Sequence, residues 1–298
     1  MSFAAESGPY AAARVAIIGS AGRYGRWLAG FFKANPVLAV DVRGHDPADP
    51  SSDAPDALAP WADVVVFCAP VAKTVAVIER FTRCAPSRAH QQLWMDLTSI
   101  KAAPVAAMQA SGAEVLGLHP MCAPPKHPHL DGHRLVVCEQ RLRTWRPWAT
   151  AFLAATRAIL VPIDAREHDR RAAQVQALGH AAHLAQLTVL ARGDLTLDAL
   201  DACATPTFSL DLAMGMRLLS GDPALYAGLL SLTHESRSSL VALRDACTFL
   251  VEATDRDSPL EALVAHIEAL QRWAGPQRIR DGDAGYRRAI EGLASPTD

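Results

Sequence analysis

The sequence predicts an α/β N-terminal Rossmann-like domain with a mostly parallel sheet, followed by an all-α C-terminal domain. Short β-rich apolar runs alternate with amphipathic helical stretches from Arg14 to about Val161. This alternation is typical of a parallel sheet covered by helices on both faces. After Pro162 the β-branched clusters stop, and Ala- and Leu-rich stretches with helical spacing follow. The second half is therefore expected to be helical.

The elements can be placed in order. We expect strands at 14–18, 38–42, 64–68, 93–96, 115–117, 134–138 and 158–162. Between them we expect helices at 24–34, 71–84, 101–110 and 140–155. Helical spacing then covers 166–192, 207–219, 223–253, 258–274 and 283–293, separated by turn residues.

The length supports two domains, because 298 residues that are half apolar can form two cores of ordinary size. We expect a flexible N-terminal tail at 1–13, a dinucleotide-binding Rossmann-like domain at 14–163 and a helical substrate and dimerisation domain at 164–298. The helices of the second domain are more apolar than one small bundle needs. This favours a homodimer through that domain.

Charge and composition point to a small-molecule partner. The net charge is −2, and acidic and basic residues are interspersed, so no nucleic-acid or membrane surface is predicted. Without a signal sequence or a membrane-spanning run, we expect a cytoplasmic protein. The six cysteines form no C-x-x-C pair and are interpreted as reduced thiols. The histidines within 126–133 are interpreted as a solvated loop, so no metal site is expected.

A glycine-rich turn follows the first expected strand and opens a helix. It consists of Gly19, Ser20, Ala21, Gly22, Arg23, Tyr24 and Gly25. Glycines allow a tight turn and a close approach to a pyrophosphate, whose charge then lies at the helix N-terminus. In this strand, turn and helix context, the spacing predicts a dinucleotide site.

Asp46 follows the next expected strand, about 20 residues beyond Gly25. A carboxylate there can accept hydrogen bonds from both ribose hydroxyls, which favours NAD over NADP. Arg43 precedes it, so NADP stays open, as does a solvated loop position for Asp46.

Ligands of open α/β sheets bind beyond the C-terminal ends of the strands. Ser20, Pro70, Ser99 and His119 are all expected there, after four different strands. A histidine whose pKa lies near working pH can take the proton of a substrate hydroxyl. The alternative for His119 is a histidine that bonds only loop backbone.

Ser99 is a helix N-cap candidate and a hydrogen-bond partner for His119 or the substrate. Arg217 lies in an apolar helical stretch and needs a partner such as a substrate carboxylate, unless it extends into solvent. His180 alone would be interpreted as a core histidine.

These motifs resemble the bacterial prephenate dehydrogenase family, and most of all the dehydrogenase part of the bifunctional chorismate mutase/prephenate dehydrogenases. The likeness covers roughly 14–293. It is carried by 15–26, Asp96–Lys101, Val115–Met121, Glu167–Asp169, Gln176–His180, Arg217 and Asp222–Tyr226.

The resemblance implies an NAD-dependent oxidative decarboxylation of prephenate to 4-hydroxyphenylpyruvate and CO2, in tyrosine biosynthesis. It implies that His119 and Ser99 are catalytic. It also implies that the substrate is bound by Arg217, Lys101, His180 and Gln176, with Pro70 at the cofactor.

The chain departs from the family in two respects. We expect neither a mutase domain before the fold nor a regulatory domain after it. Residues 121–126 and Ser209 differ from relatives in ways that touch the pocket. Two alternative substrates therefore stay open, 4-amino-4-deoxyprephenate and arogenate. An alternative function, that of a non-catalytic dinucleotide sensor, also stays open. Retained His119 and Ser99 favour a hydroxyl substrate.

Overall fold

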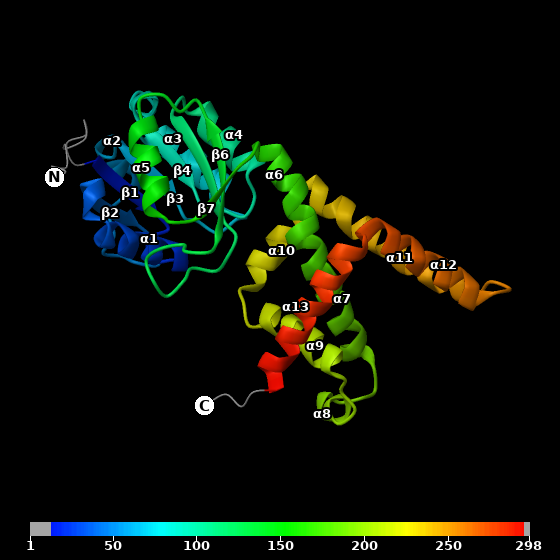
Figure 1. Ribbon diagram of the computed structural model, residues 1–298. Helices are drawn as coiled ribbons and strands as arrows, with labels where there is room; N and C mark the ends of the chain where they lie inside the picture. Colours follow the sequence, from blue (N-terminus) through cyan, green and yellow to red (C-terminus); the bar gives the residue numbers. More distant parts are fainter. Residues whose placement is uncertain (1–12, 295–298) are drawn as a thin grey trace, which may run out of the picture. The chain divides into compact units, whose positions relative to one another are not determined.

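The computed structural model describes residues 13–294, which form two compact units divided between Ala172 and Ala173 (Figure 1). The tail expected at 1–13 lies outside the described residues except for Ala13, which begins the first strand. The domain boundary expected after residue 163 precedes helix α6 (Ala165–Ala172), which belongs with the first unit.

Seven strands of the described first unit form one sheet in the order β2-β1-β3-β4-β5-β6-β7. Only the β5–β6 pair is antiparallel among these neighbours. The strands are β1 (Ala13–Ile18), β2 (Val40–His45), β3 (Val64–Phe67), β4 (Leu93–Asp96), β5 (Glu114–Pro120), β6 (Arg134–Gln140) and β7 (Ile159–Pro162). The predicted α/β fold with a mostly parallel sheet is confirmed.

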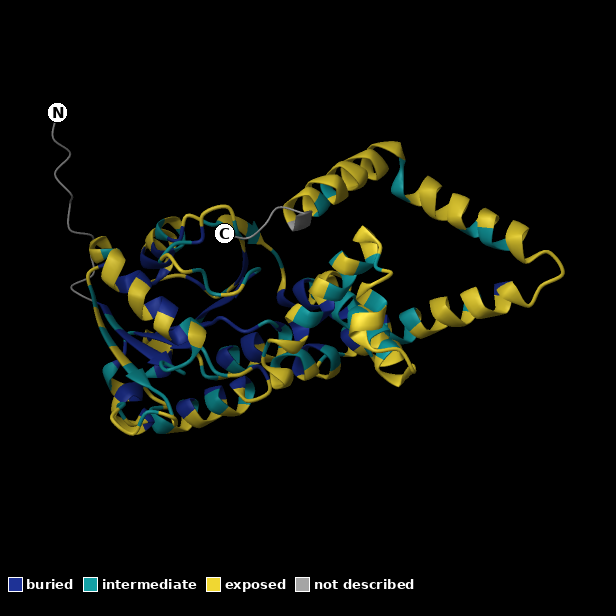
Figure 2. Ribbon diagram, turned by 90° about the horizontal axis from the view of Figure 1, so that it is seen from below, coloured by how far each residue is buried: buried dark blue, intermediate teal, exposed yellow. Residues whose placement is uncertain are grey.

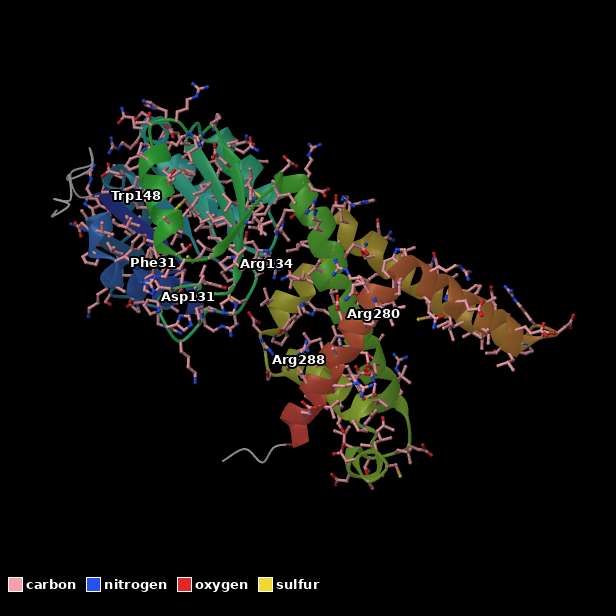
Figure 3. The ribbon with its side chains drawn as sticks, in the orientation of Figure 1. Phe31, Asp131, Arg134, Trp148, Arg280 and Arg288 are labelled. Atoms are coloured by element: carbon pink, nitrogen blue, oxygen red, sulfur yellow. The ribbon has the colours of Figure 1, made fainter. Side chains whose placement is uncertain are left out.

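Helices cover the sheet on both faces, and each face has its own apolar core. One core packs α1 (Arg23–Ala34) and α5 (Arg146–Ala155) on the sheet, and its residues Phe31 and Trp148 are labelled in Figure 3. The other core packs α2 (Pro55–Trp61), α3 (Thr74–Cys84), α4 (Ala102–Ala110) and α6. Neighbouring strand residues alternate between the two cores, as the pleat requires. Helix α2 was not expected from the sequence.

The second unit is helical, as expected. It contains a π-helical turn (Ala173–Ala177), α7 (Leu178–Arg192), α8 (Leu197–Asp201), α9 (Pro206–Leu219), α10 (Pro223–Ser231), α11 (His234–Thr254), α12 (Pro259–Ala274) and α13 (Pro276–Ala294). The single helix expected at 223–253 is two helices, because the Thr233 hydroxyl accepts the Ser236 N–H at 3.0 Å and caps a new helix.

Burial differs between the two units. Figure 2 shows buried residues gathered in the sheet of the first unit, whereas the long helices of the second are mostly exposed. Arg280 and Arg288 in Figure 3 belong to the exposed surface of α13. No helix within residues 13–294 is both long enough and apolar enough to cross a membrane.

Candidate active site

The glycine turn after β1 can be built only from glycine at its two ends. Gly19 has φ +94°, and a Cβ added there would lie 2.7 Å from the carbonyl oxygen of Cys68. A Cβ on Gly25 would lie 2.1 Å from the carbonyl oxygen of Gly19. Real side chains cannot approach backbone this closely, so the turn depends on both glycines.

The N-terminus of α1 is open for an anion. Its N-cap residue, Gly22, makes no side-chain capping hydrogen bond, and Arg23 begins the helix. The first N–H groups of a helix need a partner and attract negative charge. The turn and the helix end together form a backbone cradle that fits a pyrophosphate.

Asp46 follows β2 and holds the glycine turn directly. Its Oδ2 accepts the N–H of Ala21 at 3.0 Å, and its Oδ1 accepts the N–H of Ala48 at 2.9 Å. A carboxylate has about four acceptor positions, so both oxygens can accept a further hydrogen bond. Arg43 lies over the ring of Trp61, 4.5 Å from its centroid.

Two further contacts fix the neighbourhood of the turn. The hydroxyl of Tyr24 donates to the carbonyl oxygen of Cys122 at 2.5 Å, which ties α1 to the segment after β5. Ser20 lies beside Gly44. A Cβ added to Gly44 would lie 2.5 Å from the Cβ of Ser20. Pro70 is exposed, and its carbonyl accepts the N–H of Lys73 at 2.8 Å in the turn before α3.

The parallel strands β1, β3, β4 and β5 are adjacent, so their C-terminal ends meet at one edge. Ser20, Pro70, Ser99 and His119 lie at or just beyond these strand ends, as expected. His119 lies within β5 rather than after it, because antiparallel pairing with β6 extends the strand and sets His119 opposite Val136.

His119 is buried, with 3 % of its surface exposed. Nδ1 of His119 lies 2.9 Å from Nε2 of His168. The other ring nitrogen of His119, Nε2, forms no hydrogen bond with a described residue. Burial lowers the pKa of His119 well below its usual 6.5, and positive charge on His168 or Lys101 would lower this pKa further. A neutral imidazole with an unpaired nitrogen can accept a proton.

His168 and its neighbour Asp169 are also buried, on α6. Nδ1 of His168 lies 2.8 Å from Oδ1 of Asp169. The Asp169 carboxylate also accepts the N–H groups of Lys101 at 2.7 Å and Ala102 at 2.9 Å. It therefore caps α4 from another helix.

Lys101, expected to line the substrate cleft, has no exposed surface. Its ammonium pairs with the carboxylate of Asp96 and donates to the carbonyl oxygen of Leu118 at 2.7 Å. A buried ammonium needs such partners because charge is costly to desolvate. The structure thus uses this side chain to join β4, β5 and α4.

Ser99, expected to bond His119, is half-buried and makes no such bond in the described residues. His168 occupies Nδ1 of His119 instead. The neighbouring Thr98 hydroxyl is the one that is engaged, with the carboxylate of Asp96 at 2.5 Å. The Ser99 hydroxyl has no hydrogen-bond partner among residues 13–294 and can bond another group.

The second unit carries the other three residues that the resemblance assigns to substrate binding, His180, Arg217 and Gln176. The ring of His180 lies 5.2 Å from that of Tyr226, and its pKa is lowered by burial, by His183 and by Arg217. Arg217 is exposed and makes no ion pair with a described residue. Gln176 has a buried side-chain oxygen without a hydrogen-bond partner. These groups can still bind a carboxylate or hydroxyl.

Sequence reasoning missed three residues of these clusters, His168, Asp169 and Tyr226. All three lie in segments that carried the family resemblance. Only the fold brings His168 to His119, which is 49 positions away. Among residues 13–294 no group of three or more His, Cys, Asp or Glu side chains is arranged to hold a metal.

Comparison with solved structures supports the fold. The structure is similar to prephenate dehydrogenase from A. aeolicus in complex with hydroxyphenyl propionate and NAD+, with a TM-score of 0.67. The match covers 89 % of this chain and 98 % of the other at 15 % identity. At this identity the likeness establishes the fold alone.

Comparison of the sequences establishes the family. The family described as "Prephenate dehydrogenase, nucleotide-binding domain" matches residues 48–139. The 4-amino-4-deoxyprephenate dehydrogenase of Streptomyces pristinaespiralis is 28 % identical over 279 residues, which are 86 % of this chain and 90 % of that protein. The T-protein of Enterobacter agglomerans is 31 % identical over 272 residues, 89 % of this chain and 69 % of that protein. The chain therefore belongs to the prephenate dehydrogenase family and is a prephenate dehydrogenase-like oxidoreductase.

Proposed function

We propose that this enzyme converts prephenate to 4-hydroxyphenylpyruvate and CO2 with NAD as oxidant. The observation that carries the proposal is His119, a buried imidazole with a lowered pKa whose Nε2 is unpaired at the C-terminal edge of the sheet. Loss of a hydride from a carbon that bears a hydroxyl requires a group that takes the hydroxyl proton. His119 is that group in the proposal.

In the proposed reaction, the substrate loses a hydride, a proton and CO2, and each has a stated destination. Bound NAD supplies the acceptor for the hydride that leaves ring C4. His119 takes the C4 hydroxyl proton at Nε2, and Ser99 donates to the oxygen that bears it. The C4 oxygen becomes a ring carbonyl as the hydride leaves. The bond from the ring to its carboxylate then breaks, CO2 departs, and the electron pair of that bond passes through the ring to the C4 oxygen. The aromatic phenolate that results takes the proton back from His119 to give the phenol.

Chain residues would hold both ligands. We assign the pyrophosphate to the backbone of the turn at 19–25 and to the N-terminus of α1. We assign the ribose hydroxyls to Asp46 and the nicotinamide side to Pro70. Arg217, Gln176 and His180 would bind the polar groups of the substrate, and the exposed guanidinium of Arg217 fits a carboxylate.

The second candidate substrate is 4-amino-4-deoxyprephenate, which carries an amine at C4. The relative that acts on this compound matches this chain over 90 % of its own length. An amine has less need of a general base, so a neutral, buried His119 favours the hydroxyl substrate.

The test is NADH formation by the purified protein with NAD and, separately, prephenate, 4-amino-4-deoxyprephenate and arogenate. The highest kcat/KM is expected with prephenate, and His119→Asn should remove most turnover while leaving the Kd for NAD nearly unchanged. A higher kcat/KM with 4-amino-4-deoxyprephenate than with prephenate would show that the amino compound is the preferred substrate. Binding of NAD without turnover of any of the three would favour a sensor.

We also propose that the helical unit forms a homodimer. Large apolar side chains on its helices are exposed, such as Leu260, Ile267 and Trp273, which is 85 % exposed. Apolar surface of this extent is typical of an interface. Sedimentation of the full chain should give twice the monomer mass, and Trp273→Arg should lower the association constant. A monomer at all concentrations would contradict the proposal.

A further inference from the structure

Asp169, His168 and His119 form a continuous hydrogen-bonded chain inside the first unit. Oδ1 of Asp169 lies 2.8 Å from Nδ1 of His168, and Nε2 of His168 lies 2.9 Å from Nδ1 of His119. All three residues are buried. The two imidazole rings meet edge to face, with centroids 5.1 Å apart and planes at 70°.

The acceptor at one end fixes every proton along this chain. An ionised carboxylate only accepts hydrogen bonds, so Nδ1 of His168 must carry its proton toward Asp169. A neutral His168 then presents a lone pair at Nε2, which accepts the Nδ1 proton of His119. His119 is left with its lone pair on Nε2, the nitrogen to which no described residue forms a hydrogen bond.

The acceptor is itself held in place by backbone. Asp169 accepts the N–H groups of Lys101 and Ala102 at the start of α4, where the helix dipole favours negative charge. The Lys101 ammonium is engaged by Asp96 and by the Leu118 carbonyl. It therefore does not compete for the oxygen that orients His168. The positive charges that act on His119 are those of His168 and Lys101, and the carboxylate that bonds His168 is that of Asp169.

We propose that His168 is a positioning residue which, oriented by Asp169, holds His119 as the tautomer protonated on Nδ1 with Nε2 free to accept a proton. The use of that nitrogen in catalysis rests on the proposed function, whereas the tautomer itself does not. A carboxylate that orients a histidine serves the same purpose in serine proteases. Here a second imidazole is interposed, so the carboxylate also remains available to cap α4.

Two substitutions separate the halves of this chain. The amide of asparagine ends at the level of the imidazole Nδ1, so His168→Asn can keep the bond to Asp169 but cannot reach His119. The amide of glutamine extends to the level of Nε2, so His168→Gln can offer its oxygen to Nδ1 of His119. Both leave Asp169 in place as the cap of α4.

The first experiment is ¹⁵N NMR of histidine-labelled protein without substrate, with His119→Asn used to identify the His119 signals. Wild type should show His119 protonated on Nδ1 and unprotonated on Nε2. His168→Asn should shift His119 toward a mixture of tautomers, and His168→Gln should restore the wild-type pattern. A wild-type His119 protonated on Nε2 would overturn the proposal, even if a variant fails to fold.

The second experiment is steady-state kinetics with prephenate and NAD. His168→Asn should lower kcat by about 10- to 1,000-fold, since the wrong tautomer costs up to about 10⁴ in the serine-protease case. Both KM values should stay within about twofold, and His168→Gln should recover at least about tenfold in kcat. Equal kcat for Asn and wild type would overturn the positioning role. No turnover by wild type with an Nδ1-protonated His119 would overturn the proposed function alone.

Discussion

The carboxylate of Asp169 caps helix α4 by accepting the backbone N–H of Lys101 at 2.7 Å, although 68 positions separate the two residues. It also accepts the N–H of Ala102 and pairs with His168. One side chain of α6 therefore fixes both the start of α4 and the histidine that contacts His119.

The first prediction concerns this cap. Asp169→Ala should lower the free energy of unfolding by about 2 kcal/mol or more, because it leaves two backbone N–H groups and an imidazole nitrogen buried without partners. Urea denaturation of both proteins measures the difference. Asp222→Ala is the matched control, since Asp222 caps α10 at an exposed site and should cost only about 1 kcal/mol. Equal losses would contradict the buried role of Asp169.

The second prediction concerns the glycine turn. Gly25→Ala should weaken NAD binding by more than about tenfold, because its Cβ would displace the Gly19 carbonyl that shapes the turn. Calorimetric titration gives the Kd. Gly30→Ala, in the same helix with open space around its Cβ, should leave the Kd unchanged and stabilise the fold by about 0.5–1 kcal/mol. Comparable Kd values for both variants would rule out the cradle.

The third prediction concerns pH. Burial holds the pKa of His119 well below 6.5, so the acid limb of kcat/KM should lie below pH 6.5. In the unfolded chain, His119 is protonated as the pH falls through its usual pKa of 6.5. In the folded protein, it is protonated only at lower pH, because burial lowers its pKa. Its contribution to stability is therefore complete above about pH 6.5 and is lost as pH falls toward the folded pKa.

Rate profiles and urea unfolding between about pH 5 and 9 measure these two effects. His119→Asn is the control, since it should lack the contribution of His119 to the pH dependence of unfolding. An acid limb centred above pH 6.5 would argue against a buried neutral base.

The fourth prediction concerns the buried ion pair. Lys101→Met should cost about 3–5 kcal/mol of unfolding free energy, because it leaves the Asp96 carboxylate buried without its cation. Lys33→Met, at an exposed site, should change stability by less than about 0.5 kcal/mol. A stable Lys101→Met enzyme with only a raised KM for prephenate would instead restore the substrate-binding role that the sequence suggested.

The fifth prediction concerns Arg217. Arg217→Met should raise the KM for prephenate by about 10- to 100-fold, the range for loss of a hydrogen bond to a charged group. Unfolding free energy should change by less than about 0.5 kcal/mol, because the guanidinium is exposed and makes no ion pair with a described residue. Arg237→Met, also exposed, is the control for steady-state kinetics. An unchanged KM would exclude Arg217 from substrate binding.

The sequence by itself determined the α/β fold, the glycine turn and the position of His119 at the carboxyl edge. These features follow from local patterns: apolar runs set the strands, and glycine spacing sets a turn that tolerates no Cβ. The break before α11 was missed because a threonine cap inside a continuous apolar pattern gives a weak local signal.

Only the tertiary structure decided which polar groups pair. The resemblance implied that Lys101 binds the substrate and that Ser99 is catalytic. In the fold, the Lys101 ammonium is buried against Asp96, and Nδ1 of His119 bonds His168 rather than Ser99. The His119–His168 pair joins β5 to a residue 49 positions away, and the cost of burying an unpaired polar group selects such a pair. The sequence specifies which polar residues are present, whereas the packed fold determines which of them are buried and which partners they bond.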